Sequence, residues 1–435
     1  MHTNKRGVGL YLFLTLFFPF TTLQANALKV KKVYLSNGLL VLLKEDHALP
    51  LVSLQAWIKV GSAYETEINN GVSHFLEHML FKKTKKYDIG EIARVIESQG
   101  GRINAGTGKD ATVFYINIPK EALDTALEIV AEVIQNATFP EEEIERERLV
   151  ILEEIKRHED NPEAILWDAF NQKIYPTIPY RFRIIGNEET IQRMSRERLI
   201  EHYRNYYVAN NITLVIVGDI SVKKLLPQLE KIFEPLPKKG PLRIPILLEN
   251  RKQSFFVQEK KSVQQAYFIA GFLGPTVEND DQYALDLLAT ILGQGRNSRL
   301  YKKLREEKEL VWSISASLLT QKGSGIFLIS GEAAAEKVSQ AMEEIYQGLL
   351  NVQKNGINEK ELARAKILIE SGWLFGNETY SGKAYTLGYG TTLKNIDYAQ
   401  KYLKNISRVQ VQDIKRVFDT YFQGEKPNAI IFYPE

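Results

Sequence analysis

Residues 114–155 read FYINIPKEALDTALEIVAEVIQNATFPEEEIERERLVILEEI, a β-rich run followed by two stretches with helical spacing of apolar residues. Residues 327–373 read FLISGEAAAEKVSQAMEEIYQGLLNVQKNGINEKELARAKILIESGW and repeat this order of elements. Such a repeat indicates an internal duplication. We therefore expect two similar units of roughly two hundred residues, each built from strands and helices.

The segment between the two copies has a different composition. Residues 234–248 read EPLPKKGPLRIPILL, with four Pro and one Gly, which is typical of an extended linker. The predicted organisation is a first domain over residues 28–233, a linker over residues 234–249 and a second domain over residues 250–435.

The composition excludes several classes of protein. The 435 residues are 44% hydrophobic and 25% charged, which is typical of globular chains rather than disordered ones. The formal net charge of +3 is too small to indicate a nucleic acid partner. The absence of Cys excludes disulfides, thiol nucleophiles and Cys-ligated zinc, so any metal must be held by His, Asp and Glu.

The first 27 residues are typical of a secretory signal. A charged start precedes the apolar run VGLYLFLTLFFPFTTL at residues 8–23, and Ala25-Asn26-Ala27 matches an A-x-A cleavage site. We expect cleavage after Ala27 and export to a bacterial periplasm, which suits a chain without Cys. The alternative is an uncleaved membrane anchor, although the run is short for a span and contains Pro19. No second candidate span follows.

The strongest chemical signal is His74-Phe75-Leu76-Glu77-His78. Residues four apart lie on one face of a helix, so His74 and His78 can converge on one cation, with Glu77 beside them. This is the H-x-x-E-H arrangement of zinc peptidases. The alternative is a pair of packed or solvated histidines. The remaining histidines of the mature chain are expected at the surface: His47, His158 and His202.

Two His are too few for a catalytic zinc site, which usually has three protein ligands, so a carboxylate is needed as well. The helix expected after Pro140 has a buried stripe of 3.6-residue periodicity, formed by Ile144, Ile151 and Ile155. Glu153 falls opposite this stripe, whereas Glu147 and Glu154 flank it on one edge. The pattern favours Glu154 as the third ligand, although both Glu147 and Glu154 could be ordinary surface charges.

Three segments together resemble the pitrilysin-type inverzincins, the family of the mitochondrial processing peptidase, insulin-degrading enzyme and bacterial two-subunit peptidases. They are HFLEH at residues 74–78, GGRINAGTGKDATVFY at residues 100–115 and ERERLVILEEI at residues 145–155. The resemblance implies an α+β fold of two related domains, each a mainly antiparallel sheet packed with helices, which enclose a chamber like a clamshell.

The resemblance also assigns roles to residues. It implies one zinc ion per chain with His74, His78 and Glu154 as ligands, and Glu77 as the base that activates the zinc-bound water. Glu147 matches the accessory acidic residue of the family. These roles agree with the chemistry of zinc hydrolases, in which a carboxylate takes the water proton.

Residues 103–107 resemble the edge strand on which the family holds its substrate as an added strand. Asn104 and Ala105 match the pattern and are predicted substrate-binding residues. Gly106 stands where an aromatic residue is common, so the side-chain contacts there differ. The alternative for Gly100, Gly101 and Gly106 is turn and bulge chemistry.

The second half departs from the first at the metal site. Asp286, Ala289 and Thr290 fall opposite His74, Glu77 and His78, and Gly372 falls opposite Glu154, so the second domain should hold no metal.

Residues 295–316 resemble the family segment that directs an Arg, and a Tyr seven residues later, at the zinc site. Arg305 fits the Arg and is a predicted substrate-binding residue, but Trp312 replaces the Tyr. An indole N–H lacks the acidity of a phenol. The alternatives are a surface Arg305 and a Trp312 packed in the core.

The leading hypothesis is an exported zinc metallopeptidase that cleaves peptides or unfolded segments bound as added strands. One rival is a catalytically weak chain that needs a metal-free homologous partner, in a homo- or heterodimer. The other rival is a structural or peptide-binding subunit. The intact motif residues argue for catalysis, and Trp312 argues for a partner.

Overall fold

A computed structural model describes residues 30–239, 248–249 and 254–435. The predicted signal sequence and half of the predicted linker, residues 240–247, lie outside these residues, and the proposed domain limits remain predictions. Among the helices of the described ranges, none combines the length and apolar character that a bilayer span requires.

The first half contains one sheet and eight α-helices among its described residues. Its strands are β1 (Lys31–Tyr34), β2 (Leu40–Glu45), β3 (Leu51–Ile58), β4 (Arg102–Thr107), β5 (Thr112–Pro119) and β6 (Ile212–Gly218). Its helices are α1 (Val72–Leu80), α2 (Glu91–Ser98), α3 (Leu123–Asn136), α4 (Glu141–Glu159), α5 (Pro162–Ile174), α6 (Glu188–Gln192), α7 (Arg196–Tyr206) and α8 (Val222–Phe233).

The second half repeats this composition of elements. Its strands are β7 (Phe256–Lys261), β8 (Ala266–Gly274), β9 (Ser313–Leu319), β10 (Gly325–Ala333) and β11 (Asn428–Pro434). Its helices are α9 (Asp281–Gly293), the π-helical turn η5 (Tyr301–Glu307), α10 (Val338–Asn355), α11 (Glu359–Gly376), α12 (Tyr380–Leu393), α13 (Ile396–Arg408) and α14 (Val411–Tyr421).

The two sheets have equivalent strand orders, as expected for a duplication. The first runs β1-β2-β6-β3-β5-β4 and the second runs β7-β11-β8-β10-β9. In each sheet one parallel pair, β2 with β6 and β7 with β11, is followed by antiparallel pairs. Strand β4, which carries the predicted substrate-binding residues, pairs only with β5 and lies at the edge of its sheet.

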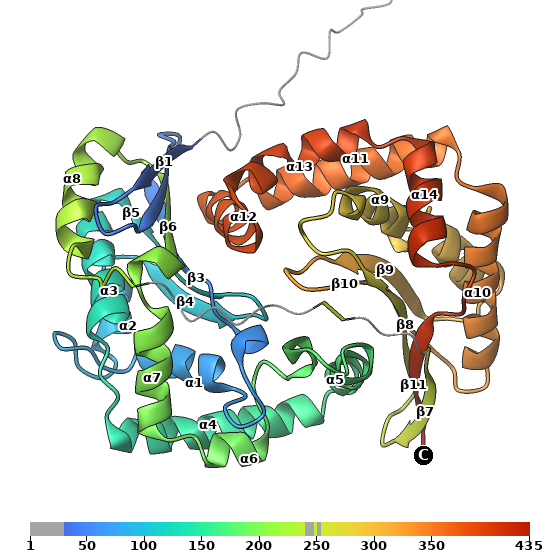
Figure 1. Cartoon of the computed structure of the whole chain (residues 1–435), viewed down its shortest axis with the longest axis horizontal. Helices are drawn as coiled ribbons and strands as arrows, with labels where there is room; N and C mark the ends of the chain where they lie inside the picture. The colour runs from blue at the N-terminus through green and yellow to red at the C-terminus, as the bar shows by residue number, and fades with distance from the viewer. Residues whose placement is uncertain (1–29, 240–247, 250–253) are drawn as a thin grey trace, which may run out of the picture.

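Helices of the same half pack against one face of each sheet. Buried side chains of α1, α3, α4, α7 and α8 form a core with the first sheet, and those of α9, α10, α11 and α14 form a core with the second. The predicted α+β fold of two related domains is therefore confirmed, and the two halves face each other in Figure 1.

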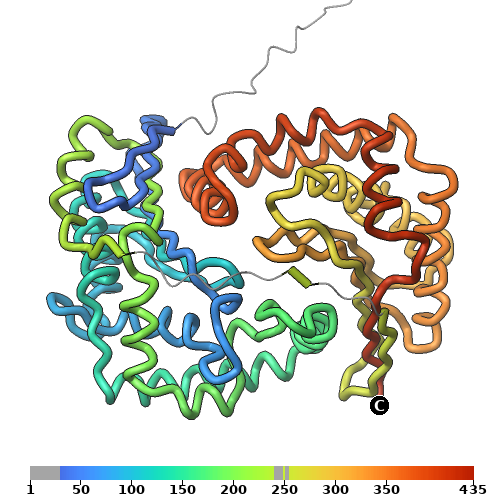
Figure 2. The backbone as a smooth tube through the Cα atoms, in the orientation of Figure 1, coloured from blue at the N-terminus to red at the C-terminus, as the bar shows by residue number. Residues whose placement is uncertain are grey.

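The other face of each sheet is covered by a helix from the opposite half. Helix α12 contributes Ala384 and Leu387 to a cluster with Trp57 of the first sheet. Helix α5 contributes Leu166 and Phe170 to a cluster with the second sheet. The tube in Figure 2 follows this reciprocal exchange, with the red-orange α12 against the first half and the green α5 against the second.

Candidate metal centre

Helix α1 holds the H-x-x-E-H motif, and a buried carboxylate fixes its first turn. Glu65 is 1% exposed, and its two carboxylate oxygens accept hydrogen bonds from the backbone N–H groups of Gly71, at 2.7 Å, and Ser73, at 2.9 Å. These groups have no partner within the helix itself, and the helix dipole favours a negative charge there. The start of α1 is therefore anchored one turn before His74.

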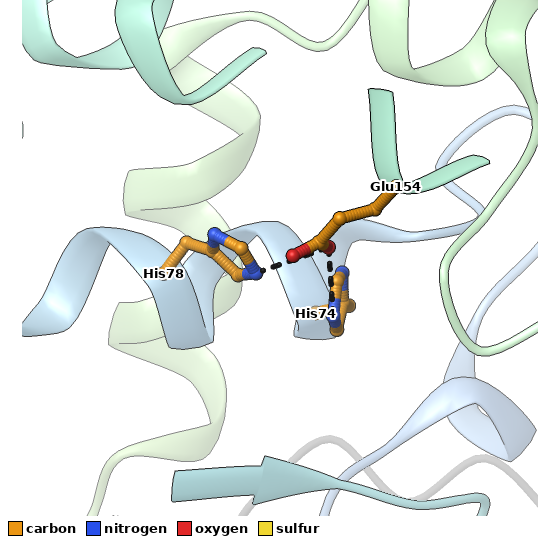
Figure 3. Close-up of side chains that lie close together, drawn as sticks. All are labelled: His74, His78 and Glu154. Carbon is orange, nitrogen blue, oxygen red and sulfur yellow. Dashed lines mark ion pairs between the residues drawn. The ribbon is translucent and has the colours of Figure 1, made fainter. Parts of the chain in front are cut away.

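The side chains of His74, His78 and Glu154 converge (Figure 3). Oε2 of Glu154 lies 3.9 Å from Nε2 of His74 and 3.5 Å from Nε2 of His78. One ligand atom from each residue lies within 4.8 Å of the others. Two atoms bound to one tetrahedral zinc ion at about 2.1 Å lie roughly 3.4 Å apart, so this set of two nitrogens and one oxygen fits zinc.

The buried apolar stripe of helix α4 turns Glu154 towards α1, as the sequence predicted. The predicted stripe is buried, because Ile144, Ile151 and Ile155 all lie in the first core. Glu153 points away, is exposed and pairs with Lys156 at 2.6 Å. The structure thus places Glu154, and not Glu153, beside the two imidazoles.

Glu147 lies two turns before Glu154 and holds the second imidazole. Nδ1 of His78 donates to Oε2 of Glu147 at 3.0 Å, and the ammonium of Lys82 pairs with the other oxygen of Glu147. Burial opposes ionisation of Glu147, but these two hydrogen bonds outweigh it and lower the pKa of Glu147. Glu147 is therefore placed to orient a metal ligand through its second ring nitrogen.

The two imidazoles have different environments. Burial, together with the nearby His78, lowers the pKa of His74 to about 3. Burial also lowers the pKa of His78, but its hydrogen bond to Glu147 and the charges of Glu154, Glu77 and Glu147 outweigh burial and raise it. Nδ1 of His74 is buried without a hydrogen-bond partner in the described part of the chain. The neutral form of His74 is the form that binds a metal.

Glu77 lies beside the ligands and is held from the edge strand. Its Oε2 accepts a hydrogen bond from Oγ1 of Thr107 at 2.5 Å. Burial raises the pKa of Glu77, although the hydrogen bond from Thr107 opposes the shift. A carboxylate with a raised pKa is suited to take and return a proton. Thr107 was not selected from the sequence, although it ends the predicted edge strand.

The predicted substrate-binding residues Asn104 and Ala105 lie on the open edge strand β4. The side-chain oxygen of Asn104 accepts from the backbone N–H of Ala105 at 2.8 Å, so this N–H is not used by the ladder with β5. Gly106 lies within β4 opposite Val113, whereas Gly100 has a φ of +75° and forms a turn. The turn interpretation therefore holds for Gly100.

A cavity of about 350 Å³ adjoins His74, one of the three predicted ligands. Its lining includes His74, Glu77 and Thr107 on one side and side chains of α4, α5 and the loop after α5 on the other. The latter group includes His158, Trp167, Asp168 and Arg183, and Lys109 joins the lining from the turn between β4 and β5. None of these five residues was predicted for the site from the sequence. A second cavity of about 360 Å³, between α5 and the second sheet, shares Trp167 with the first.

The prediction of a surface position was wrong for two histidines, His202 and His158. His202 is only 6% exposed, and its Nε2 lies 3.2 Å from Oγ of Ser73 at the start of α1. His158 is half-buried in the cavity wall, and its Nε2 donates to Asp168 at 2.6 Å. His158 follows Glu154 by four residues, so helical spacing could have found it. His47 is exposed, as expected.

The counterpart positions of the second half form no equivalent cluster. Asp286 accepts a hydrogen bond from Tyr402 at 2.8 Å, and burial raises the pKa of Asp286 to about 7. Arg305 is exposed on η5. Trp312 is 48% exposed, which excludes the alternative of core packing. The substrate-binding role of Arg305 remains a prediction.

Comparisons with known proteins identify the family of this chain. Residues 40–186 match the family described as Insulinase (Peptidase family M16), and residues 193–369 match the Peptidase M16 inactive domain. A Rickettsia felis protein named as an uncharacterized zinc protease is 31% identical over 91% of this chain and 96% of its own length. A Bacillus subtilis protein named as the uncharacterized zinc protease YmxG is 30% identical over 89% of this chain and 95% of its own length.

Solved structures show the same architecture. A protease from Helicobacter pylori superimposes with a TM-score of 0.88 and 26% identity, over 93% of this chain and all of that chain. A Pseudomonas fluorescens structure described as a peptidase M16 inactive domain superimposes with a TM-score of 0.87 at 23% identity, which shows the shared fold. The chain therefore belongs to the pitrilysin-type zinc peptidases of family M16.

Proposed function

We propose that this chain is an exported zinc metalloendopeptidase that binds one zinc ion through His74, His78 and Glu154. The observation that supports this most strongly is the convergence of the three ligand atoms within 4.8 Å, with Glu77 next to His74 in the wall of the adjoining cavity. Neither a nucleotide nor a nucleic acid is needed for this chemistry. The proposal places the mature protein in the periplasm after cleavage behind Ala27.

Zinc in this position would lower the pKa of a coordinated water and polarise the peptide carbonyl. Glu77 then accepts the proton of the attacking water and returns it to the amine that leaves. Thr107 keeps the Glu77 carboxylate in place through its hydrogen bond. Glu147 orients His78 and, with Lys82, stays ionised.

The substrate would be an extended peptide that adds to the open edge of β4. The backbone N–H of Ala105 is available on this edge once the Asn104 side chain turns away, because Asn104 is its hydrogen-bond acceptor in the free protein. Backbone pairing of this kind recognises unfolded segments of varied sequence. Thr107, at the end of β4, links the bound strand to Glu77.

The replacement Glu77→Gln tests the function directly. It removes the base and leaves the three ligands, so zinc content and peptide binding should persist while kcat falls by at least about a hundredfold. Peptide cleavage by mass spectrometry, zinc content and peptide binding by fluorescence anisotropy should be measured on the same preparations. Normal turnover by the variant would exclude the role of Glu77.

A second candidate function is a chain that needs a metal-free homologous partner, and the exposed Trp312 favours it. A Tyr hydroxyl near the developing oxyanion would contribute on the order of 3 kcal/mol, and an indole would not reproduce its placement. Weak solitary activity, strong stimulation by such a partner and a gain from Trp312→Tyr would support this candidate. Full solitary activity that is insensitive to Arg305→Ala would exclude both the partner requirement and the role of Arg305.

A further inference from the structure

The cavity beside the ligands has room for a large substrate side chain. A Cβ atom added to Gly106 would meet nothing within 4 Å, so β4 leaves this side of the cavity open. Trp167, Ile184 and Ile185 supply apolar surface to the wall. The volume of about 350 Å³ exceeds what one side chain occupies, and the apolar wall suits the stem of a long one.

Two cationic side chains also line this cavity. The guanidinium of Arg183 donates through Nε to Asp168 at 2.9 Å and through Nη1 to the exposed Glu159 at 3.2 Å. A guanidinium has five N–H groups, so these two contacts leave donors for a ligand. The ammonium of Lys109 donates to the backbone carbonyls of Tyr180 and Phe182, which neutralise no charge.

Asp168 holds Arg183 and His158 in place at the cavity wall. Its Oδ2 accepts hydrogen bonds from both Arg183 and His158, and the residue is 8% exposed. Arg183 is therefore paired with two carboxylates, Asp168 and Glu159, whereas Lys109 makes hydrogen bonds to backbone carbonyls and lies in the field of Asp168, Glu65 and Asp110. Burial lowers the pKa of Lys109 to about 8, which leaves most of its ammonium charged at neutral pH. The N–H groups that these contacts leave unused on Arg183 and Lys109 are charged donors in the cavity lining.

We infer that this cavity selects an acidic side chain, Glu in preference to its isostere Gln, within two residues of the bond that is cut. The stem of a Glu side chain would pack against Trp167, and its carboxylate would meet Arg183 and Lys109. Charge-assisted bonds to carboxylates are about twice as strong as neutral ones, which gives the basis for discrimination. This inference rests on the proposed peptidase function and names a substrate preference for it.

The test uses the full zinc-loaded chain and peptides that differ only by Glu, Gln or Lys at each of the four positions around the cut. We expect one position at which Glu raises kcat/KM over Gln by on the order of tenfold. Arg183→Gln and Lys109→Gln should bring this ratio close to one, and Arg183→Lys should retain part of it. Gly106→Phe should reduce cleavage of the Glu and Gln peptides relative to an Ala peptide.

The matched control is Arg181→Gln. Arg181 lies two residues from Arg183, but it stacks on Phe182 and pairs with Glu67, so the ratio should not change. Zinc content and thermal unfolding identify any variant that fails to fold. A Glu-to-Gln ratio of kcat/KM near one at every position in wild type overturns the inference. So does an unchanged ratio in both Arg183→Gln and Lys109→Gln when these variants fold.

A second measurement separates this inference from the proposed function. Zinc-loaded Glu77→Gln should bind the Glu peptide more tightly than the Gln peptide in fluorescence anisotropy, and Arg183→Gln in the same background should abolish the difference. Absence of cleavage by wild type with a preserved binding preference would contradict the peptidase proposal alone. Cleavage with equal binding of the two peptides would contradict the inference alone.

Discussion

Nδ1 of His78 lies 3.0 Å from Oε2 of Glu147, so the imidazole that faces Glu154 is fixed from behind by a second carboxylate. Replacing Glu147 with Gln keeps the size of the side chain but weakens this hold, because a neutral amide is a poorer acceptor. We expect zinc affinity to fall by about 10- to 100-fold, measured by competition with a chromophoric chelator. Glu142→Gln, an exposed position on the same helix, should leave affinity unchanged.

The ligand set predicts a sharp difference between adjacent residues. His74→Ala, His78→Ala and Glu154→Gln should each lose most of the bound zinc, since a catalytic site needs three protein ligands. Glu153→Gln should retain the full complement, because Glu153 is exposed and paired with Lys156. Metal analysis of dialysed protein measures the zinc content of each variant. Zinc loss in Glu153→Gln but not in Glu154→Gln would make Glu153 the third ligand.

The contact between α12 and the first sheet predicts a change in stability. A Cβ at Gly388 would lie 2.0 Å from Nε1 of Trp57, so Gly388→Ala should lower the free energy of unfolding by about 1–3 kcal/mol. The same change at Gly372, an exposed helical position with nothing within 4 Å of its Cβ, should be neutral or stabilise by up to about 1 kcal/mol. Denaturant titrations of the two variants compare them directly.

His202 predicts a pH dependence of stability. Burial lowers the pKa of His202 to about 3, so its unfolded form binds a proton first as the pH falls below about 6.5. The stability that neutral His202 supports is therefore present above pH 6.5 and is lost as the pH falls towards 3.

At pH 5 the loss from His202 amounts to about 2 kcal/mol relative to pH 8. His202→Gln cannot take up this proton. The difference in unfolding free energy between wild type and this variant should therefore narrow by that amount between pH 8 and pH 5. Both proteins should be measured without metal so that zinc release does not contribute. If the difference in unfolding free energy between the two proteins stayed constant from pH 8 to pH 5, the lowered pKa of His202 would be contradicted.

The parts of the site that follow a helical period could be predicted from the sequence. His74 and His78 share one face of α1, and the apolar stripe of α4 selected Glu154 over Glu153. The period extends to His158, but nothing local shows that Asp168 would meet it. Asp168 is brought there by the packing of α5, which depends on contacts between distant segments.

The same limit applies to His202 and to the exchange of helices between the halves. His202 was expected at the surface. The helical period of α7 would place it on a buried face only if the elements that pack against α7 were known. Helix α12 contains Gly388 where Trp57 lies close, a fit between residues more than three hundred positions apart. Local patterns predict elements and their faces, whereas the partner of each face is decided by the whole fold.

Helix α5 belongs to the first half by sequence, but its apolar side chains are buried on the second sheet. The same helix contributes Trp167 and Asp168 to the cavity at the ligands, and Trp167 also borders the second cavity. Any swing of one half away from the other must either peel α5 from the second sheet or draw it away from β4. A swing that peels α5 from the second sheet opens the second cavity and leaves the lining of the first in place, whereas a swing that keeps α5 on the second sheet dismantles the substrate pocket.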